Sequence, residues 1–212
     1  MSQIDARPPA APAEPDARAV HSDSAAPIHE RTILDDAAIR RALMRIAHEI
    51  VERTEQIDRL YLVAIPNGGV PLGRILVENL ASLTGQAVPL GILDTTLYRD
   101  DLATRSARPR LRKTEMPSSV DDRAVVIVED VVSTGRTIRA GMDALMEFGR
   151  PSNVRVMALV DRGHRELPIK IDFVGKNIPT QPEDKVIFLS EEESGGQGLL
   201  IVVREGGQHD RS

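Results

Sequence analysis

The sequence predicts an α/β fold in which a central, mostly parallel sheet is flanked by helices. Short runs of branched apolar residues alternate along the chain with longer segments in which apolar residues recur every three or four positions. This alternation is typical of β–α units, whose helices cover both faces of a parallel sheet. Hydrophobic residues make up 41% of the 212 residues and aromatic residues only 2%, so we expect an aliphatic core.

The first 30 residues differ in composition from the rest. They consist mainly of Ala, Pro and small polar residues, and cannot bury enough apolar surface to offset the entropy lost on ordering. We therefore expect a disordered tail over 1–30 and a single domain over 31–212. The tail has neither the apolar stretch of a secretory signal nor the acid-poor composition of a transit peptide. No apolar run is long enough to span a membrane, so we expect a cytoplasmic protein.

The first half of the domain predicts two helices and two strands. Apolar residues at 39, 43, 46 and 50 place one face of a helix over 33–54, with Asp35 as its N-cap. The remaining elements follow from apolar runs bounded by Gly and Pro: a strand over 59–65, a tight loop over 66–69, a helix over 70–84 ended by Gly85, a strand over 88–98 and a long surface loop over 99–122.

The second half continues the alternation. It predicts a strand over 123–130, a helix over 135–149 and a strand over 153–161. Shorter β segments follow at 171–174, 186–189 and 199–203, and the glycine-rich stretch 194–198 is expected to be a hairpin turn. Cys is absent from the whole sequence, which excludes disulfides, thiolate metal sites and a cysteine nucleophile.

One stretch, VVIVEDVVSTGRT at 125–137, predicts a ligand site. In an open α/β sheet, ligands bind beyond the carboxyl ends of the strands, and the N-terminal amides of the following helix favour an anion. Ser133, Thr134 and Thr137 add hydroxyl donors, and Gly135 lets the backbone approach a ligand closely. These features together predict a phosphate cradle.

Glu129 and Asp130 precede that cradle, although carboxylates repel phosphate. Their presence is explained if the ligand also carries hydroxyl groups or a cation, as a sugar phosphate with bound Mg²⁺ does. The alternative is an ordinary strand–helix turn in which the two acids only cap amides. The sequence favours the sugar phosphate because hydroxyl and glycine residues follow the acids at this spacing.

The stretch 125–137 resembles the signature for phosphoribosyl pyrophosphate (PRPP) of the type I phosphoribosyltransferases. The resemblance implies that family's fold, with a small hood region beside the sheet, and implies that Glu129 and Asp130 hold the ribose hydroxyls. It further implies that the 5′-phosphate is bound by Ser133, Thr134, Gly135, Arg136 and Thr137, and pyrophosphate by the loop Pro66, Asn67, Gly68 and Gly69. In that loop the family usually has Arg or Lys where this chain has Asn67. Loss of a hydrogen bond to a charged group costs about 1.5–3 kcal/mol, so we expect catalysis weakened by roughly one to two decades.

Segments 38–53, 95–102 and 159–180 resemble those of a branch of this family that combines regulation of pyrimidine biosynthesis with uracil phosphoribosyltransferase activity. This implies that uracil displaces pyrophosphate from PRPP to give UMP, with Mg²⁺ held by PRPP and not by direct protein ligands. Arg99 and Asp100, which open a mobile loop, and Asp130 are the candidate catalytic residues, with Arg99 neutralising the departing pyrophosphate. The alternative for Arg99 and Asp100 is that they are solvated loop charges.

A local cluster of basic residues suggests a second activity in a chain whose net charge is −5. The resemblance implies that this surface binds a hairpin in the leader of pyrimidine mRNA. The candidate RNA-binding residues are Arg41, Arg45, His48, Arg53, Arg162, His164, Arg165, Lys170 and Lys176. A charged helix face is often only solvated, so that reading stays open, as does a purine phosphoribosyltransferase without an RNA role. We also expect a homo-oligomer, because the helices carry aliphatic residues beyond one buried face.

Overall fold

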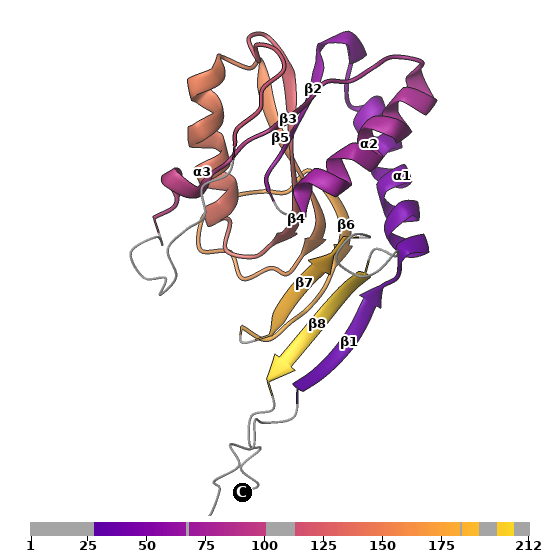
Figure 1. Ribbon diagram of the computed structural model, residues 1–212, viewed down its shortest axis with the longest axis vertical. Coiled ribbons are helices and arrows are strands. Elements are labelled where there is room, and N and C mark those ends of the chain that lie inside the picture. The colour runs from indigo at the N-terminus through magenta and orange to yellow at the C-terminus, as the bar shows by residue number, and fades with distance from the viewer. Residues whose placement is uncertain (1–27, 67, 101–112, 183, 191–198, 206–212) are drawn as a thin grey trace, which may run out of the picture.

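The computed structural model describes residues 28–66, 68–100, 113–182, 184–190 and 199–205. Two sheets organise this part of the chain (Figure 1). The larger is a five-stranded parallel sheet in the order β3-β2-β4-β5-β6, with strands Leu90–Ile92, Leu60–Ala64, Ala124–Val132, Asn153–Asp161 and Phe173–Asn177. The smaller is antiparallel in the order β1-β8-β7, with strands Ile28–Leu34, Leu199–Glu205 and Lys185–Leu189. The expected α/β fold is confirmed.

The helices cover both faces of the parallel sheet because alternate residues of its central strands point to opposite sides. Leu62 of β2 and Val126 of β4 pack under α1 (Asp36–Glu52) and α2 (Gly69–Thr84). Val63 and Ile127 pack instead on the side of α3 (Arg136–Leu145). Each strand is therefore apolar on both faces, which is why these strands read as continuous hydrophobic runs.

Helix ends follow the expected capping residues. Oδ1 of Asp35 accepts a hydrogen bond from the backbone N–H of Ala38 at 2.7 Å, as an N-cap does at α1. Gly85 ends α2 in the left-handed region, with φ of +70°. Helix α3 is shorter than expected, since its last residues form a separate 3₁₀ helix, η4 (Met146–Phe148).

Several predicted strands have different bounds; the segment expected over 171–174, for example, is β6 and begins two residues later. The strand expected over 88–98 is only β3, because the chain turns away after Ile92 into the 3₁₀ helix η2 (Thr96–Tyr98), whose Thr96 N–H bonds the side chain of Asp94 at 2.9 Å. Strand β4 runs two residues further than expected and pairs with β5 as far as Val132. Glu129 and Asp130 lie within the strand, as expected, but two further residues of β4 follow them.

Strand β1 is absent from the prediction, and it corrects the expected tail for residues 28–30. It begins at Ile28, which pairs with Glu205 of β8, and the register continues to Leu34. The rest of the expected tail, residues 1–27, lies outside the described part of the chain, as does the turn 194–198. The antiparallel pairing of β7 with β8 across that turn is the arrangement a hairpin gives.

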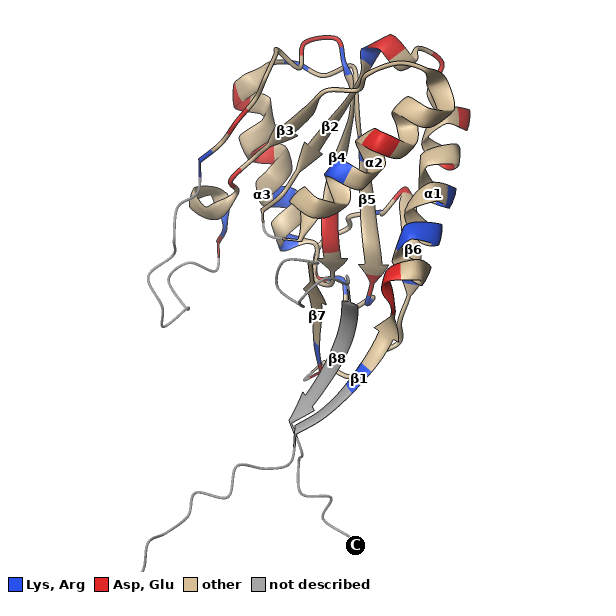
Figure 2. Cartoon of the chain, turned by 45° about the vertical axis from the view of Figure 1, so that its right-hand side comes forward, with Lys and Arg blue, Asp and Glu red and all other residues tan. Residues whose placement is uncertain are grey.

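The small sheet lies beyond the carboxyl ends of β4 and β5 (Figures 1 and 2). It occupies the place of the expected hood region, so the edge of the sheet at which ligands bind in this class of fold is partly covered. Within the described residues, no helix has both the length and the apolar composition needed to cross a membrane.

Candidate functional site

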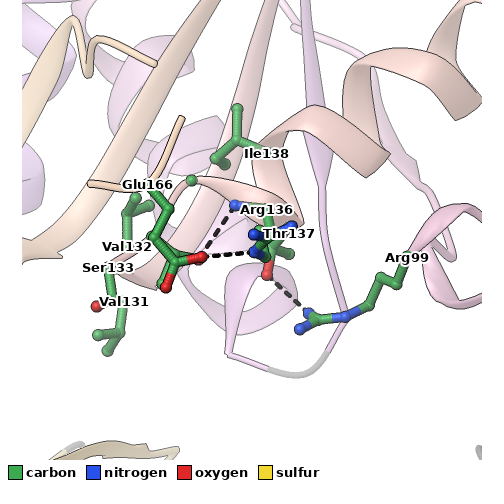
Figure 3. Close-up of a pocket in the computed structure, with 10 residues that line it drawn as sticks. Arg99, Val131, Val132, Ser133, Arg136, Thr137, Ile138 and Glu166 are labelled. Atoms are coloured by element: carbon green, nitrogen blue, oxygen red, sulfur yellow. Dashed lines mark hydrogen bonds and ion pairs between the residues drawn. The ribbon is translucent and has the colours of Figure 1, made fainter. Parts of the chain in front are cut away.

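A pocket of about 460 Å³ opens where β4 ends and α3 begins (Figure 3). Gly135 has a φ of +90°, which turns the chain sharply from the strand into the helix. Thr134 steadies this turn, because its Oγ1 accepts a hydrogen bond from the backbone N–H of Arg136 at 3.3 Å. The lining residues are Arg99, Val131, Val132, Ser133, Thr134, Gly135, Arg136, Thr137, Ile138 and Glu166. The structure thus brings together the five residues expected to bind the 5′-phosphate.

Arg99 reaches this pocket from the start of the 99–122 loop. Its Nη1 donates a hydrogen bond to Oγ1 of Thr137 at 2.7 Å (Figure 3). The guanidinium therefore adds a positive charge beside the N-terminus of α3, where backbone amides already favour an anion. Arg99 therefore lies against the turn of residues 133–137, which is the proposed phosphate loop.

Glu129 and Asp130 lie beside the pocket. Glu129 is buried, and its Oε2 has no hydrogen-bond partner within the described residues. Burial, and next the neighbouring Asp130 charge, raise the pKa of Glu129 well above its usual 4.5, while the positive charge of Arg99 acts in the opposite direction. Oδ1 of Asp130 accepts a hydrogen bond from the backbone N–H of Val131 at 2.8 Å, as the capping alternative predicts, but that alternative does not account for the unpartnered buried oxygen of Glu129.

Asp130 faces the loop expected to bind pyrophosphate. A Cβ built on Gly68 would lie 2.3 Å from Oδ2 of Asp130, and one built on Gly69 would lie 2.5 Å from the carbonyl oxygen of Val128. The two glycines therefore let the start of α2 approach β4 more closely than any larger residue could. Pro66 precedes them in the turn that follows β2, and Asn67 lies outside the described residues.

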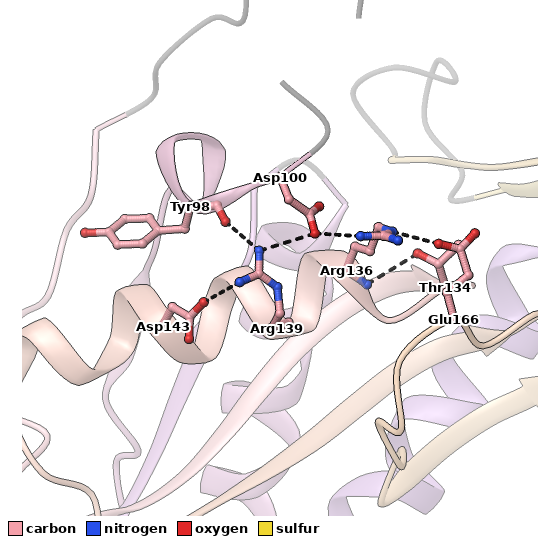
Figure 4. A network of polar contacts seen from close by, with 7 residues as sticks. All are labelled: Tyr98, Asp100, Thr134, Arg136, Arg139, Asp143 and Glu166. Carbon is pink, nitrogen blue, oxygen red and sulfur yellow. Dashed lines mark hydrogen bonds and ion pairs between the residues drawn. The ribbon is translucent and has the colours of Figure 1, made fainter. Parts of the chain in front are cut away.

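An ion-pair network joins the 99–122 loop to α3 (Figure 4). Nη1 of Arg136 lies 2.5 Å from Oδ2 of Asp100, and Nε of the same residue lies 2.7 Å from Oε2 of Glu166. Arg139 donates to the carbonyl oxygen of Tyr98 at 3.0 Å. Glu166 was not among the predicted site residues. It is a single acid in a mainly basic segment, and no local pattern indicates that it contacts residues of α3.

Three of the candidate RNA-binding residues lie on α1, and a fourth, Arg53, is its C-cap. Arg41 and His48 are exposed. Nη2 of Arg45 donates to the carbonyl oxygens of Val174 and Gly175 at 2.8 and 2.9 Å, and Arg53 stacks over the ring of Phe173, 5.3 Å from its centroid. Arg45 and Arg53 thus hold α1 against β6, and Figure 2 shows the Arg positions along α1 in blue.

The basic residues after β5 likewise fall into two groups, those exposed to solvent and those bonded within the protein. Lys170 and Lys176 are exposed. Arg162 donates to the carbonyl oxygen of Asp184 at 2.6 Å, and Arg165 pairs with Asp161 at 2.7 Å. Nε2 of His164 lies 2.9 Å from the carbonyl oxygen of Thr180. The two arginines therefore use their donors inside the protein, whereas the two lysines face outward.

No direct metal-ligand set is formed by the described residues, among which no three His, Asp or Glu side chains converge. Glu129 and Asp130 directly precede Val131, the first lining residue of β4, and their carboxyl oxygens are acceptors of the kind that ribose hydroxyl groups need.

Comparison with known proteins gives the family. Residues 29–192 match the phosphoribosyl transferase domain. The protein named bifunctional protein PyrR from Pelotomaculum thermopropionicum is 49% identical over 170 residues, which are 80% of this chain and 94% of the relative. The protein of the same name from Bacillus subtilis is 48% identical over 175 residues, 82% of this chain and 96% of the relative.

Solved structures agree on the fold. A hypoxanthine phosphoribosyltransferase from Trypanosoma cruzi superposes with a TM-score of 0.60 at 18% identity, covering 83% of this chain and 97% of the other. One from Staphylococcus aureus gives a TM-score of 0.56 at 18% identity, with 71% and 79% covered. With the domain match and the close relatives, the chain belongs to the phosphoribosyltransferase family, in the group of the bifunctional PyrR proteins.

Proposed function

We propose that the protein regulates pyrimidine biosynthesis by binding the leader of pyrimidine mRNA in a uridine-nucleotide-dependent manner, and that it also converts uracil and PRPP to UMP and diphosphate. One observation carries the proposal. A buried acid, Glu129, and a half-buried one, Asp130, lie at the same strand end as the phosphate loop, so a ligand there must present hydroxyl groups to the acids and an anion to the loop. A ribose 5-phosphate unit has both.

In the reaction, N1 of uracil forms a bond to C1 of the ribose while the bond from C1 to pyrophosphate breaks; pyrophosphate leaves with the electron pair, and the proton of N1 is lost to solvent. Glu129 and Asp130 orient the ribose through its hydroxyls, and the phosphate loop fixes the other end of the sugar. This holds C1 in one position for attack. Arg99 and the backbone N–H groups of the Gly68–Gly69 loop stabilise negative charge on the two sides of the sugar.

Mg²⁺ enters the proposal with PRPP. The oxygen acceptors of Glu129 and Asp130 suit the ribose, and the phosphates of PRPP supply ligands for the ion. When bound, it would stabilise the charge on departing pyrophosphate. Because Asn67 stands where a basic residue is usual, we expect this chain to turn over slowly even with Mg²⁺ present.

The regulatory part of the proposal is supported by the exposed basic residues of α1 and β6. Arg41, His48 and Lys176 lie on adjoining elements, and Lys170 lies on the segment between β5 and β6. Cations on one surface bind a phosphate backbone whatever the net charge of the chain. We propose that this surface takes the RNA hairpin and that UMP in the pocket promotes binding, which leads to transcription termination.

A purine substrate is the alternative. The solved structures described above are purine enzymes, but their identity of 18% supports the fold alone. The relatives at 48–49% identity cover nearly their whole length and favour the pyrimidine function. We therefore retain uracil as the substrate.

Two assays test the proposal. Labelled uracil incubated with PRPP and Mg²⁺ should give UMP, with hypoxanthine and guanine as controls that give no nucleotide. Gel-shift titration with a pyrimidine leader hairpin should show tighter binding with UMP than without it. Product from a purine but not from uracil would overturn the enzymatic part, and RNA binding indifferent to UMP and to leader sequence would overturn the regulatory part.

The proposal includes a cytosolic location and self-association. Leu97, Met146 and Phe148 are exposed by 70%, 53% and 39% on η2 and η4, which the hydrogen bond between Tyr98 and Glu147 brings together. An exposed apolar patch of this kind supports a homo-oligomer. Light scattering would give the number of subunits.

A further inference from the structure

The backbone of the phosphate loop is held in one orientation by the segment that follows β5. Three consecutive carbonyl oxygens accept hydrogen bonds from it: Val132 from the N–H of Arg162 at 2.9 Å, Ser133 from Nη1 of Arg165 at 2.6 Å, and Thr134 from the N–H of Glu166 at 3.1 Å. In a trans peptide, the carbonyl of one residue and the N–H of the next point in opposite directions. The N–H groups of residues 133–135 are therefore turned away from this segment, as a phosphate cradle requires.

Of these three bonds, the one to Ser133 is made by a side chain, that of Arg165. Its guanidinium is mostly buried, with 23% of the side chain exposed, and it also pairs with Asp161 at 2.7 Å. It donates further to the carbonyl oxygens of Ile169 and Gly163 at 3.0 and 3.2 Å. All three guanidinium nitrogens thus have acceptors inside the protein, which leaves this group little capacity for a phosphate from outside.

The chain is bent to allow this arrangement. Gly163 and His164 both have positive φ angles, +74° and +56°, so the segment curls back and returns Arg165 to Asp161 and to the phosphate loop. The same bend leaves His164 exposed on the outer side. Residues 162–170 are therefore bonded to the phosphate loop on one side and face solvent on the other. A change in the conformation of the loop can alter the conformation of that exposed side.

We propose that Arg165 is a positioning residue for the 5′-phosphate loop and not an RNA contact, and that it couples nucleotide binding to the RNA surface carried by the same segment. This rests on the proposed function. An anion bound to the loop amides stabilises the peptide orientation that Arg165 holds, and hence the conformation of residues 162–170. Because coupling is reciprocal, RNA bound to that conformation tightens nucleotide binding in turn.

The test compares UMP with uridine, which lacks the phosphate, by calorimetry. Arg165→Gln removes the bond to Ser133 and should weaken UMP binding about tenfold, with the affinity for uridine unchanged. Arg165→Lys, which keeps the charge but not the planar fork, should recover part of the loss. Asp161→Asn keeps an acceptor for the N–H of Gly163 but removes the charge that faces Arg165. This variant should therefore also weaken the binding of UMP more than the binding of uridine. Arg59→Gln, an exposed arginine at the opposite edge of the sheet, is the control and should match the parent.

RNA titrations separate positioning from direct contact. At saturating UMP, Arg165→Gln should bind the leader hairpin as the parent does, with the same dependence on salt, and should need about tenfold more UMP to reach that state. Loss of RNA affinity at saturating UMP, with a shallower salt dependence and unchanged UMP binding, would overturn the proposal. So would an equal loss for UMP and uridine with a lower melting temperature, which indicates a merely structural role. If the parent protein bound no UMP, the proposed function itself would fail, whereas equal UMP binding by parent and variant would remove only this inference.

Discussion

The guanidinium of Arg99 lies on the hydroxyl of Thr137, with Nη1 donating to Oγ1 at 2.7 Å. This bond joins the start of the 99–122 loop to the phosphate loop, across 38 residues of sequence. It also brings the positive charge close enough to Glu129 to oppose the rise in the pKa of that carboxyl group. One side chain therefore acts on both halves of the proposed ribose-phosphate site.

Arg99→Gln should weaken UMP binding roughly 10- to 100-fold, because a charge-assisted hydrogen bond to the phosphate contributes about 1.5–3 kcal/mol. The Kd for UMP by calorimetry and the KM for PRPP measure this. Lys113→Gln is the control, since that exposed lysine pairs with Glu115 away from the pocket. UMP contains no pyrophosphate, so a fall in kcat with unchanged UMP binding would instead support Arg99 as the group that neutralises departing pyrophosphate.

The buried carboxyl group of Glu129 should make stability depend on pH. Its pKa in the folded protein is raised above the usual 4.5, chiefly by burial, so between these two values the folded state holds a proton that the unfolded state has lost. The stability contributed by the protonated form is complete below about pH 4.5 and is lost as the pH rises through the folded pKa. Urea unfolding over a pH series should therefore show a decline that is smaller in Glu129→Gln. An identical decline in the variant would show that another group is responsible.

Nucleotide binding should release protons from the same group. Ribose hydroxyls donate hydrogen bonds to an ionised carboxylate, so UMP selects the ionised form of Glu129. Calorimetry in two buffers of different ionisation enthalpy measures the protons released. We expect a net release from the parent protein that disappears in Glu129→Gln, and equal release from both would contradict the assignment of Glu129 to the ribose.

Gly68→Ala should damage the site more than the fold. The added Cβ would lie 2.3 Å from Oδ2 of Asp130, so this carboxylate must move from the place where it meets the ribose. We expect the KM for PRPP to rise by about tenfold or more, together with some loss of melting temperature, because the start of α2 must also move away from β4 to make room for the methyl group. Gly85→Ala supplies the opposite pattern, since φ of +70° makes alanine cost roughly 1–2 kcal/mol there without affecting the KM. A normal KM for Gly68→Ala would argue against ribose binding by Asp130.

Asn67 permits a gain-of-function test. A basic residue at this position adds a charge-assisted contact to pyrophosphate, so Asn67→Arg should raise kcat/KM for PRPP about 10- to 100-fold. Binding of UMP, which has no pyrophosphate, should stay the same. Equal turnover by both proteins would show that Asn67 does not limit the reaction.

The sequence predicted the site best where local residues determine it. In the stretch 125–137 the signal lies in consecutive residues: an apolar run, two acids and a hydroxyl–glycine turn. These residues form the expected strand, loop and helix N-terminus. Strand β1 was missed because its partner β8 lies at the other end of the chain. The inward orientation of Arg165 was missed for a similar reason, since its acceptors include Ser133, 32 residues earlier. Composition identifies a basic cluster, but tertiary contacts decide which of its cations face solvent.

The difference between exposed basic residues and those bonded within the protein gives a prediction for RNA binding. Arg41 and Lys176 are exposed, so Arg41→Gln and Lys176→Gln should each lower RNA affinity and reduce the slope of log K against log salt by a little under one, as expected for one lost phosphate contact. Arg45→Gln should act differently, because Arg45 donates to two carbonyls of β6: it should lower the melting temperature by loosening α1 from that strand. Gel shifts at several salt concentrations and thermal unfolding measure these effects. Unchanged salt slopes for the two exposed cations would place the RNA on another surface.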